Sequence, residues 1–419
     1  MQDFKFKRNK LFCEQVSLQA IADKLGTPLF VYSYNGLISS FNALKQAFSR
    51  VSPLICYSVK VNSNLSVCRV LAQQGAGMDI VSGGELFRAK KIKVPGKKIV
   101  YSSVGKTEAE IEAGIKAGIL FFNAESVPEL ELINKTAFKL GKIQKVAVRI
   151  NPDVEAYTHR YITTAKKQNK FGIDLMTSRY IFLTLSSKFK NLDLCGIHMH
   201  IGSQILKNIP FAQAMEKAVK LITELSEKGV KITHLNIGGG IGIVYNQEKA
   251  LDLCAYASSV IKAVENIDLK LILEPGRFIA GNAGVLLAKI LYIKQTPVKH
   301  FIIVDTAMND LIRPAFYQAY HQVIPVCMRK KTELYKTDIV GPVCESSDFL
   351  AKDRFLPDWL KQNDLLAVMS AGAYGFVMSS NYNSRPRAAE VLVKADKYYL
   401  IRKRDSFGDL VGNEIVCNV

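Results

Sequence analysis

The sequence predicts an α/β protein that combines a (β/α)8 barrel with an antiparallel β domain. Short apolar strands alternate with helical patterns between residues 55 and 274, and this alternation stops near residue 280. Polar residues gather where the apolar strands end. Strands that alternate with helices form parallel sheets, and eight such units make a closed barrel. An open doubly wound sheet is the alternative, but the first strand–helix turn carries no GxGxxG motif.

The predicted barrel strands are short apolar segments. They are Ile55–Lys60, Met78–Val81, Ile99–Ser102, Leu120–Asn123, Val146–Ile150, Cys195–His200, His234–Ile237 and Leu271–Glu274. Helical patterns lie between them, for example at Glu108–Ala117, Pro128–Leu140, Phe211–Lys228 and Lys249–Val264. The polar segment Pro152–Lys170 lacks periodicity and follows the fifth strand, so we expect a mobile loop at the barrel mouth.

Strand-like segments with few long helices between them follow residue 280, as is typical of an antiparallel β domain. They are Val285–Tyr292, His300–Asp305, Gln322–Met328, Thr337–Val340, Leu365–Ser370 and Ala389–Ile401. The N-terminal segment Pro28–Tyr32 can complete this sheet. We therefore expect a barrel domain over residues 34–280. A β-sandwich or β-barrel domain is expected to comprise residues 1–33 and 281–419.

Composition narrows the class of protein. Of the 419 residues, 48% are hydrophobic and 22% charged, which is ordinary for a globular protein. No apolar run reaches the roughly 18 residues of a membrane span, and Met1–Lys10 has no apolar signal segment. The eight cysteines include no CxxC pair, which indicates reduced thiols. We expect a cytoplasmic protein without a membrane partner.

The net charge of +19 raises the question of nucleic acid. The lysines are spread along amphipathic helices, and no long basic block or basic–aromatic motif stands out. We interpret the charge as a solvated basic surface, which can also steer an acidic substrate, and expect no nucleic-acid partner.

A lysine ends the first predicted strand. Desolvation lowers the pKa of an amine, and a partly neutral amine can attack a carbonyl to form a Schiff base. Active sites of such barrels lie at the carboxyl ends of the strands. The residues at those ends are Lys60, Asp79, Ser102, Asn123, Asn151, His198, His200, Gly238, Gly239, Gly240, Glu274, Pro275, Gly276 and Arg277.

Glycines at 238–240 follow the seventh strand, where barrels bind phosphate, although a plain turn would also explain them. Glu274 ends the eighth strand, and a carboxylate there could face a pyridine nitrogen. Arg277 could clamp a phosphate or carboxylate, with a structural ion pair as the alternative.

His198 and His200 share a strand face, but further zinc ligands are not obvious, so we expect no metal. Stacking of His200 on a cofactor ring is favoured over a buried core histidine.

The β domain offers further candidates. The loop Gly341–Asp348 combines the thiol of Cys344 with the carboxylate of Glu345, and such a thiol can donate a proton, although an ordinary loop cysteine is the alternative. Tyr374 lies in a glycine-flanked turn. Arg313 and Tyr317 are four residues apart and share a face if their segment is helical, with a surface pair as the alternative.

Together these motifs resemble the meso-diaminopimelate decarboxylases, pyridoxal-phosphate enzymes of the alanine-racemase-like fold. The resemblance runs from about Pro28 to Val416. It rests on YSVKVN (57–62), GMDIVSGGEL (77–86), HMHIGSQ (198–204), NIGGG (236–240), EPGR (274–277), GPVCESSD (341–348), GAYG (372–375) and YNSRPR (382–387). Ornithine and arginine decarboxylases share the lysine motif and EPGR, whereas CESSD with YNSRPR is more particular to the diaminopimelate enzymes.

The resemblance implies decarboxylation of meso-2,6-diaminopimelate at the D-centre to L-lysine and CO2, the last step of lysine biosynthesis by this route. It implies that Lys60 forms a Schiff base with pyridoxal 5'-phosphate, that His200 stacks on its ring and that Glu274 holds its pyridine nitrogen. Other implied cofactor-binding residues are Asp79, Ser203, Gly238, Gly239, Gly240, Pro275, Gly276, Arg277 and Tyr374.

For the substrate, the resemblance implies that Arg277, Arg313 and Tyr317 bind the carboxylates. Glu345 recognises the distal amino group. Tyr374 touches both cofactor and substrate, and Cys344 donates the proton. Cys344 and Glu345 are expected to enter the partner's active site in a head-to-tail homodimer.

Two alternatives stay open. One is another decarboxylase of this fold, of the ornithine, arginine or carboxynorspermidine type. Glu345 with Arg277 and Arg313 discriminates against it, since these residues suit a substrate that ends in both charges. A non-catalytic regulatory homologue would be expected to lose Lys60 or Cys344, and both are present.

Overall fold

The computed structural model describes residues 3–155, 170–329 and 333–417. Most of the predicted loop Pro152–Lys170 therefore lies outside the described residues. The chain divides into two compact units. The β unit comprises Met1–Ser39, Val244–Glu248 and Ile279–Val419, and the barrel unit comprises Ser40–Ile243 and Lys249–Phe278.

Parallel strands close the barrel unit, which confirms the predicted (β/α)8 barrel. Eight strands of the described chain form the ring in the order β5 (Leu54–Ser58), β6 (Gly77–Ile80), β7 (Ile99–Tyr101), β8 (Phe121–Ala124), β9 (Gln144–Asn151), β11 (Leu192–His198), β12 (His234–Asn236) and β13 (Lys270–Leu273). Pairing of β13 with β5 completes the ring. The short strand β10 (Ile173–Asp174) pairs in parallel with the last two residues of β9.

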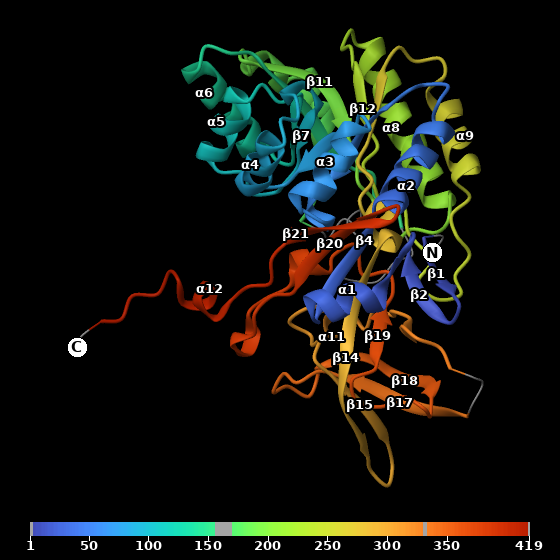
Figure 1. Cartoon of the computed structure of the whole chain (residues 1–419). Coiled ribbons are helices and arrows are strands. Elements are labelled where there is room, and N and C mark those ends of the chain that lie inside the picture. The colour runs from blue at the N-terminus through green and yellow to red at the C-terminus, as the bar shows by residue number, and fades with distance from the viewer. Residues whose placement is uncertain (1–2, 156–169, 330–332, 418–419) are drawn as a thin grey trace. The chain divides into compact units, whose positions relative to one another are not determined.

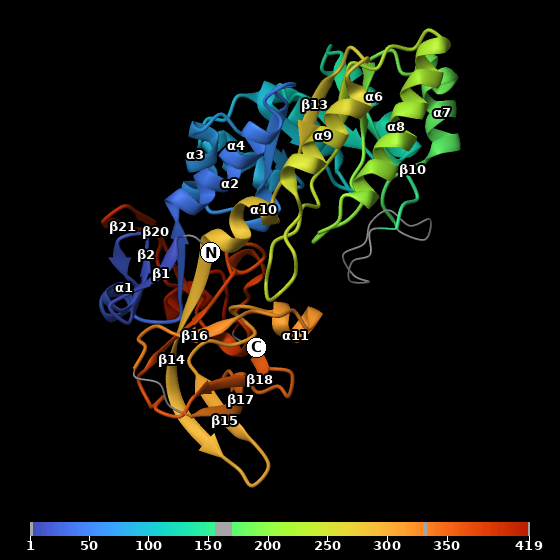
Figure 2. The same cartoon turned by 90° about the vertical axis from the view of Figure 1, so that its right-hand side faces the viewer.

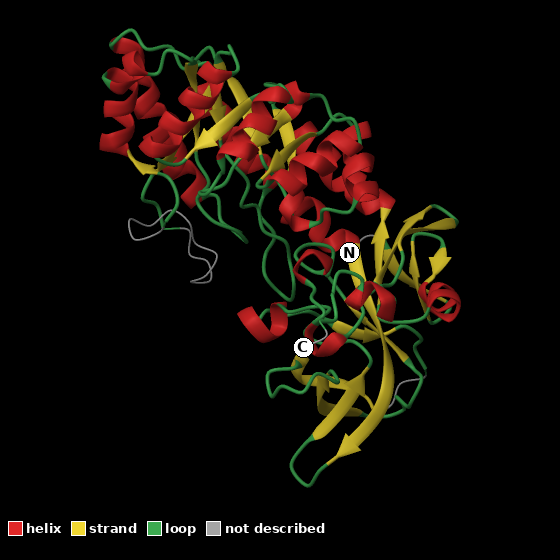
Figure 3. Cartoon of the chain, turned by 90° about the vertical axis from the view of Figure 1, so that its left-hand side faces the viewer, coloured by secondary structure: helices red, strands yellow, loops and turns green. Residues whose placement is uncertain are grey.

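Helices cover the barrel strands, as the red and yellow ribbons of Figure 3 show. They are α3 (Leu65–Gln73), α4 (Gly83–Lys91), α5 (Glu108–Lys116), α6 (Val127–Lys139), α7 (Leu175–Leu183), α8 (Ile209–Glu227) and α9 (Leu253–Val264). Helices α8 and α9 lie side by side (Figure 2). A further helix, α2 (Tyr34–Ala47), precedes β5. Within the described residues no helix combines the length and apolar character needed to cross a membrane.

Polar side chains begin most of these helices. Ser82, Ser126 and Asp252 each accept a hydrogen bond from a backbone N–H in the first turn. Thr107 forms a reciprocal capping box with Glu110. Such caps satisfy N–H groups that have no partner within the helix, and each is worth about 1 kcal/mol. The caps therefore set where each helix leaves the strand end before it.

The β unit is mostly antiparallel (Figure 1). Its main strands are β4 (Leu29–Ser33), β14 (Gly284–Gln295), β15 (His300–Val304), β16 (Val323–Pro325), β17 (Leu334–Val340), β18 (Phe349–Pro357), β19 (Leu365–Val368), β20 (Ala389–Lys394) and β21 (Lys397–Arg402). Strand β4 pairs with β14 and β20, which confirms that an N-terminal strand completes this sheet. Pairs β15–β17 and β4–β20 are parallel.

Two details of the β unit differ from the prediction. Segment Ala389–Ile401 is not one strand but the hairpin β20–β21, with Ala395 in a left-handed conformation at the turn (φ 53°). Strand β18 was not predicted, because its sequence FLAKDRFLP interrupts the alternation with three charged residues, two of them exposed. The local sequence pattern therefore predicted these strand boundaries wrongly, because pairing between segments that are distant in sequence determines them.

Smaller elements complete the β unit. They are β1 (Phe4–Lys7), β2 (Lys10–Cys13), β3 (Val16–Ser17), α1 (Leu18–Leu25), α11 (Arg313–Tyr317) and α12 (Phe407–Val411). Helix α10 (Arg277–Ala280) follows β13.

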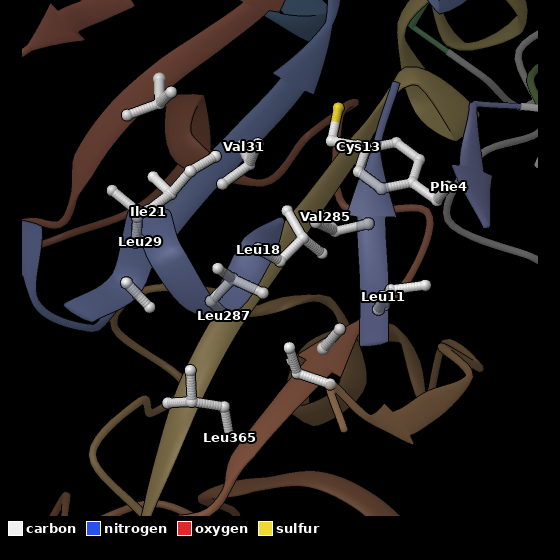
Figure 4. Packing of buried hydrophobic residues seen from close by; sticks show 14 of the residues in the cluster. Phe4, Leu11, Cys13, Leu18, Ile21, Leu29, Val31, Val285, Leu287 and Leu365 are labelled. Carbon is white, nitrogen blue, oxygen red and sulfur yellow. The ribbon is translucent and has the colours of Figure 1, made fainter. Parts of the chain in front are cut away.

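The core of the β unit joins its two ends in sequence. Leu29 and Val31 of β4 and Val285 and Leu287 of β14 are fully buried and contribute to one cluster with Leu18 of α1 (Figure 4). Residues two apart in a strand share a face, so the alternation of each strand aims these side chains inward. Burial of each such side chain is worth about 1.5–3 kcal/mol. The N-terminal segment is thereby fixed onto a sheet made from residues beyond 280.

Candidate functional site

Lys60 lies just beyond the end of β5. The strand ends at Ser58, not at Lys60 as predicted, and Val59–Val61 form a 3-10 turn in which Asn62 N donates to Val59 O (3.1 Å). The valines of this turn are buried, and burial is equally compatible with a strand or a turn, so the apolar run could not show the difference. The turn places the lysine at the carboxyl end of the barrel strands.

The amine of Lys60 is paired but accessible. Its Nζ lies 2.5 Å from Asp79 Oδ2, and the side chains are 32% and 0% exposed, respectively. Ser58 Oγ donates to the same carboxylate oxygen at 2.7 Å. Burial raises the pKa of Asp79, and the charge of Glu274 raises it further, whereas the charge and hydrogen bond of Lys60 lower it. A buried carboxylate thus holds an amine that remains reachable from the barrel mouth.

Glu274, at the end of β13, accepts hydrogen bonds from residues at the ends of three other barrel strands, β8, β11 and β12. His198 Nε2 lies 3.1 Å from Oε2, while the side-chain amides of Asn123 and Asn236 donate to Oε1 at 3.1 Å and 2.7 Å. Burial raises the pKa of Glu274, but the charge and hydrogen bond of His198, the charge of Lys60 and the hydrogen bond of Asn236 outweigh it. The pKa therefore falls well below its ordinary value, and Glu274 is a buried carboxylate.

His200 presents a neutral ring at the same mouth. Burial lowers its pKa to about 3, and the charges of Arg149 and Lys60 act in the same direction, against that of Glu274. Gly239 N donates to His200 Nδ1 at 3.1 Å. A neutral imidazole that accepts at Nδ1 carries its proton on Nε2. The flat ring is thus fixed by the glycine loop that follows β12.

The glycines of this loop are required by close packing. Gly238 has φ 67°, and a Cβ on Gly239 would lie 2.2 Å from Glu274 O. Gly238 N donates to Asn236 Oδ1 (3.0 Å) and Gly239 N to His200, so both amides have partners within the protein. The loop is therefore packed directly against the end of β13, and a side chain at position 239 would clash with the Glu274 carbonyl. Its role in phosphate binding stays a prediction.

Arg277 and Ser203 come together at the barrel mouth. Arg277 Nη2 donates to Ser203 Oγ at 3.2 Å, and the arginine is 7% exposed. Ser58 N donates to Pro275 O, so the EPGR segment is held against the strand that leads to Lys60. A Cβ on Gly276 would lie 2.5 Å from Val61 Cγ1. The predicted barrel residues thus gather at one end of the strands.

A buried ion-pair network stands near this mouth and was missed from the sequence. Arg149 Nη1 pairs with Glu125, and Lys106 Nζ lies 2.6 Å from Glu129 Oε1. Glu129 also accepts a hydrogen bond from Glu125 N (2.8 Å). These four residues lie on or after strands or at the start of a helix. In the sequence they are isolated charges, so their pairing could not be predicted.

The β unit contains the remaining candidates. Cys344 and Glu345 are exposed in the loop after β17, and Asn383 Oδ1 accepts a hydrogen bond from Cys344 N at 2.8 Å. Asp348 accepts from Met308 N (2.7 Å) and Val343 N (2.8 Å), which anchors both ends of the loop. The GPVCESSD and YNSRPR motifs are thereby joined.

Arg313 begins helix α11 and Tyr317 ends it. The segment is therefore helical, which is the condition for the two residues to share a face. Tyr374 adopts a left-handed backbone conformation (φ 55°) between two glycines. These residues belong to the β unit.

Comparison with known proteins places this geometry in a family. Residues 35–281 match the family model described as pyridoxal-dependent decarboxylase, pyridoxal binding domain. Diaminopimelate decarboxylases of Aquifex aeolicus and Vibrio cholerae are each 48% identical, with 97% of this chain and 96% and 97% of theirs covered. The chain belongs to the diaminopimelate decarboxylase family.

A solved structure agrees in fold. The diaminopimelate decarboxylase of Helicobacter pylori, complexed with L-lysine, aligns with a TM-score of 0.91 and 40% identity over 94% of this chain and 98% of that one. The resemblance found from the motifs is thereby confirmed.

The described residues fit the family's cofactor. Lys60 offers a reachable amine, and Glu274 is held as an anion by three donors. Arg277 and Ser203 form a pair of donors suited to an anion. An aldehyde, a ring nitrogen and a phosphate would therefore each have a suitable group among these residues.

Sequence reasoning missed the support around Glu274. Asn123 was noted as a strand-end residue, Asn236 only as part of a motif, and His198 only as a strand-end residue that shares a face with His200. Their common feature is visible in the sequence, because each ends a predicted barrel strand or lies within two residues of its end. Closure of the barrel is what brings the three side chains to one carboxylate.

Proposed function

We propose that this chain decarboxylates meso-2,6-diaminopimelate at its D-centre and releases L-lysine and CO2, with pyridoxal phosphate as cofactor. The observation that carries the proposal is the meeting, in one barrel mouth, of the Lys60 amine with a Glu274 carboxylate that its neighbours keep charged. Membership in the diaminopimelate decarboxylase family supports the choice of substrate. The L-lysine bound to the Helicobacter pylori relative supports the choice of product.

The barrel unit would hold the cofactor. Lys60 would hold it through its amine, Glu274 at the ring nitrogen and His200 at the ring face. The phosphate would be held by Ser203, Gly238, Gly239, Gly240, Pro275, Gly276 and Arg277. When bound, pyridoxal phosphate supplies an electron sink for breaking the bond between Cα and its carboxylate. Asp79 orients the Lys60 amine, and the charge of Glu274 favours a protonated ring nitrogen.

Further residues would select the substrate and complete the reaction. Arg277, Arg313 and Tyr317 would bind its carboxylates, and Glu345 would bind its distal ammonium group. Tyr374 would contact both cofactor and substrate. The Cys344 thiol would give its proton to Cα after CO2 has left. An amino acid without the distal charges would leave buried charged groups without partners, at a cost of several kcal/mol, roughly, so it would be rejected.

A homodimer with shared active sites is part of the proposal. Cys344 and Glu345 are exposed, which suits residues that serve a partner's site. Arg277→Ala and Glu345→Ala variants, each inactive alone, should recover partial activity when co-expressed, because one of the two sites in a mixed dimer would keep both residues. Absence of recovery in dimers shown to be mixed would contradict the shared site.

We further propose that the enzyme works in the cytoplasm. All eight cysteines are free thiols, which suits a reducing compartment. Fractionation of cells with an antibody to this chain would test the location.

Assays with purified protein would test the substrate. Incubation with pyridoxal phosphate and meso-diaminopimelate should release L-lysine and CO2 in equal amounts, whereas L-ornithine and L-arginine should give little CO2. Reduction of the resting protein with borohydride should attach the cofactor covalently to the peptide that contains Lys60. Attachment there together with preferred turnover of ornithine or arginine would keep the cofactor site and overturn the substrate.

A further inference from the structure

A buried histidine supports Arg313 within the β unit. Gln318, which follows helix α11, has a left-handed conformation (φ 53°), and the chain turns back so that His321 comes to lie beside the first residue of the helix. Arg313 Nη1 and His321 Nε2 are 2.8 Å apart, and the residues are 7% and 0% exposed. His321 Nδ1 lies 2.8 Å from Met369 O. Both ring nitrogens are thus engaged.

The two partners fix the tautomer of His321. A guanidinium has only donors, so Nε2 must accept from Arg313. A carbonyl oxygen only accepts, so Nδ1 must carry the proton that it donates to Met369 O. The ring therefore joins Arg313 to the sheet as a neutral acceptor, and this contact adds no opposite charge to offset that of the guanidinium, as a carboxylate would.

The sheet holds the histidine in place. Met369 follows β19, and its N–H donates to Gln322 O at 2.8 Å, next to His321 in sequence. Directly beyond these residues β16 and β19 pair in antiparallel fashion, with Val323 opposite Val368. Backbone hydrogen bonds directly beyond its contact with Met369 O therefore hold His321 in place.

An aromatic ring provides a second contact for Arg313. Its Cζ lies 4.9 Å from the centre of the Tyr245 ring. The rings of Tyr245 and His321 are 5.4 Å apart and nearly perpendicular, at 78°. A π face attracts a guanidinium without removing its charge. Arg313 is thus oriented by two neutral groups.

We propose that His321 is a positioning residue for substrate recognition, which aims the charged guanidinium of Arg313 at a substrate carboxylate. The inference rests on the proposed role of Arg313 in binding that carboxylate. A flexible, four-torsion arginine side chain loses conformational entropy when it binds, and a preformed hydrogen bond lowers that cost. Loss of the His321 contact should therefore weaken substrate binding more than it slows turnover.

Two variants separate the two hydrogen bonds of His321. In His321→Asn the side-chain amide nitrogen replaces Nδ1 and can still donate to Met369 O, but the side chain is too short to reach Arg313. In His321→Gln the amide oxygen replaces Nε2 and can still accept from Arg313. We expect His321→Asn to raise KM about tenfold with kcat within about twofold of wild type, since a hydrogen bond to a charged group is lost. His321→Gln should keep KM within about threefold.

A double-mutant cycle excludes a purely structural role. In an Arg313→Ala background, His321→Asn should cause no further loss of kcat/KM, because its effect runs through the missing guanidinium. An equal loss in both backgrounds would overturn the inference, as would an unchanged KM in His321→Asn with wild-type Arg313. If His321→Asn fails to fold, a tenfold rise of KM in His321→Gln would likewise overturn it.

The same experiment distinguishes failure of the proposed function. A wild-type protein that does not decarboxylate meso-diaminopimelate would refute that function alone. The cycle is then measured with the amino acid that the wild type does decarboxylate, and coupling between His321 and Arg313 in kcat/KM would still support the positioning role.

Discussion

His198 Nε2 lies 3.1 Å from Glu274 Oε2, and the two side chains are 1% and 2% exposed. His198 Nδ1 makes no hydrogen bond within the described residues. A carboxylate oxygen only accepts, so Nε2 carries a proton that it donates to Glu274. This histidine is part of what keeps the carboxylate charged.

Replacement of His198 by leucine should therefore weaken the site. Glu274 would keep only its two asparagine donors, and its pKa would rise toward the ordinary range. Cofactor affinity should fall, and we expect a loss of stability of about 1–3 kcal/mol at neutral pH, measured as a lower Tm of the protein. His198→Gln is the matched control, because its amide nitrogen can replace Nε2 as donor. Equal losses of stability and cofactor affinity in both variants would show that packing of the imidazole ring, and not its hydrogen bond to Glu274, supports the site.

The sign of the pH dependence follows from the depressed pKa of Glu274. Its contribution to stability is present above the unfolded value of 4.5 and is lost as the pH falls toward the folded pKa. The difference in Tm between wild type and His198→Leu should therefore be largest above about pH 5 and should shrink at lower pH. A difference that grows on acidification would contradict the assignment of Glu274 as a carboxylate.

Lys60 is expected to be the point of cofactor attachment. Lys60→Ala should abolish turnover and the covalent adduct that borohydride traps. Lys60→Arg is the informative companion, because a guanidinium can keep the ion pair with Asp79 but does not form the bond to the cofactor. Both variants should lose the adduct. Only Lys60→Ala should leave the buried Asp79 carboxylate without its ion-pair partner. An adduct that persists on another peptide of either variant would refute this role.

The barrel and the strand ends could be predicted because local pattern encodes them. Apolar strand bodies end at polar residues, and parallel strands bring those ends to one side of the sheet. Lys60 and Glu274 were found in this way. The prediction did not reach the hydrogen bonds of Glu274, because Asn123 and Asn236 meet it only when the ring of strands closes.

Contacts in the β unit were harder to foresee for a related reason. His321 and Arg313 are close in sequence, but their contact depends on the left-handed turn at Gln318, a residue with no strong preference for that conformation. The hairpin at Ala395 was missed for the same reason. Non-glycine residues with positive φ carry little sequence information, so the turns they make are visible only in the structure.

His200 should make stability depend on pH over a defined range. Its pKa is about 3 in the folded protein against 6.5 for an ordinary histidine, so below 6.5 the unfolded chain takes up a proton that the folded protein does not. The stability of the folded protein should therefore fall as the pH drops from about 6.5 toward 3. Above about pH 6.5, His200 should not make stability depend on pH. His200→Asn removes the titration and keeps an acceptor at the position of Nδ1 for Gly239 N.

Thermal unfolding of the two proteins at several pH values would test this. The Tm of His200→Asn should fall less than that of wild type between pH 7.5 and 5, while the two curves should run parallel above pH 7. A steeper fall in the variant would mean that His200 is protonated in the folded protein, and would remove the basis for a neutral ring at the barrel mouth.

The thiol of Cys344 is the final group whose role can be isolated. Its loop is held by the backbone, because Cys344 N donates to Asn383 and Asp348 binds the N–H groups of Met308 and Val343. Alanine keeps that backbone N–H, so Cys344→Ala should leave the loop in place and remove only the proton donor. Turnover should fall by roughly 100-fold or more, as is usual for loss of a general acid, while cofactor affinity stays unchanged.

Cys254→Ala is the matched control, since Cys254 is also exposed but lies on helix α9 of the barrel unit. It should keep wild-type turnover. A Cys344→Ala protein that retains full turnover would exclude the thiol as proton donor. One that loses its cofactor would instead assign Cys344 to the binding of that group, because the backbone anchors of its loop do not depend on the side chain that was removed.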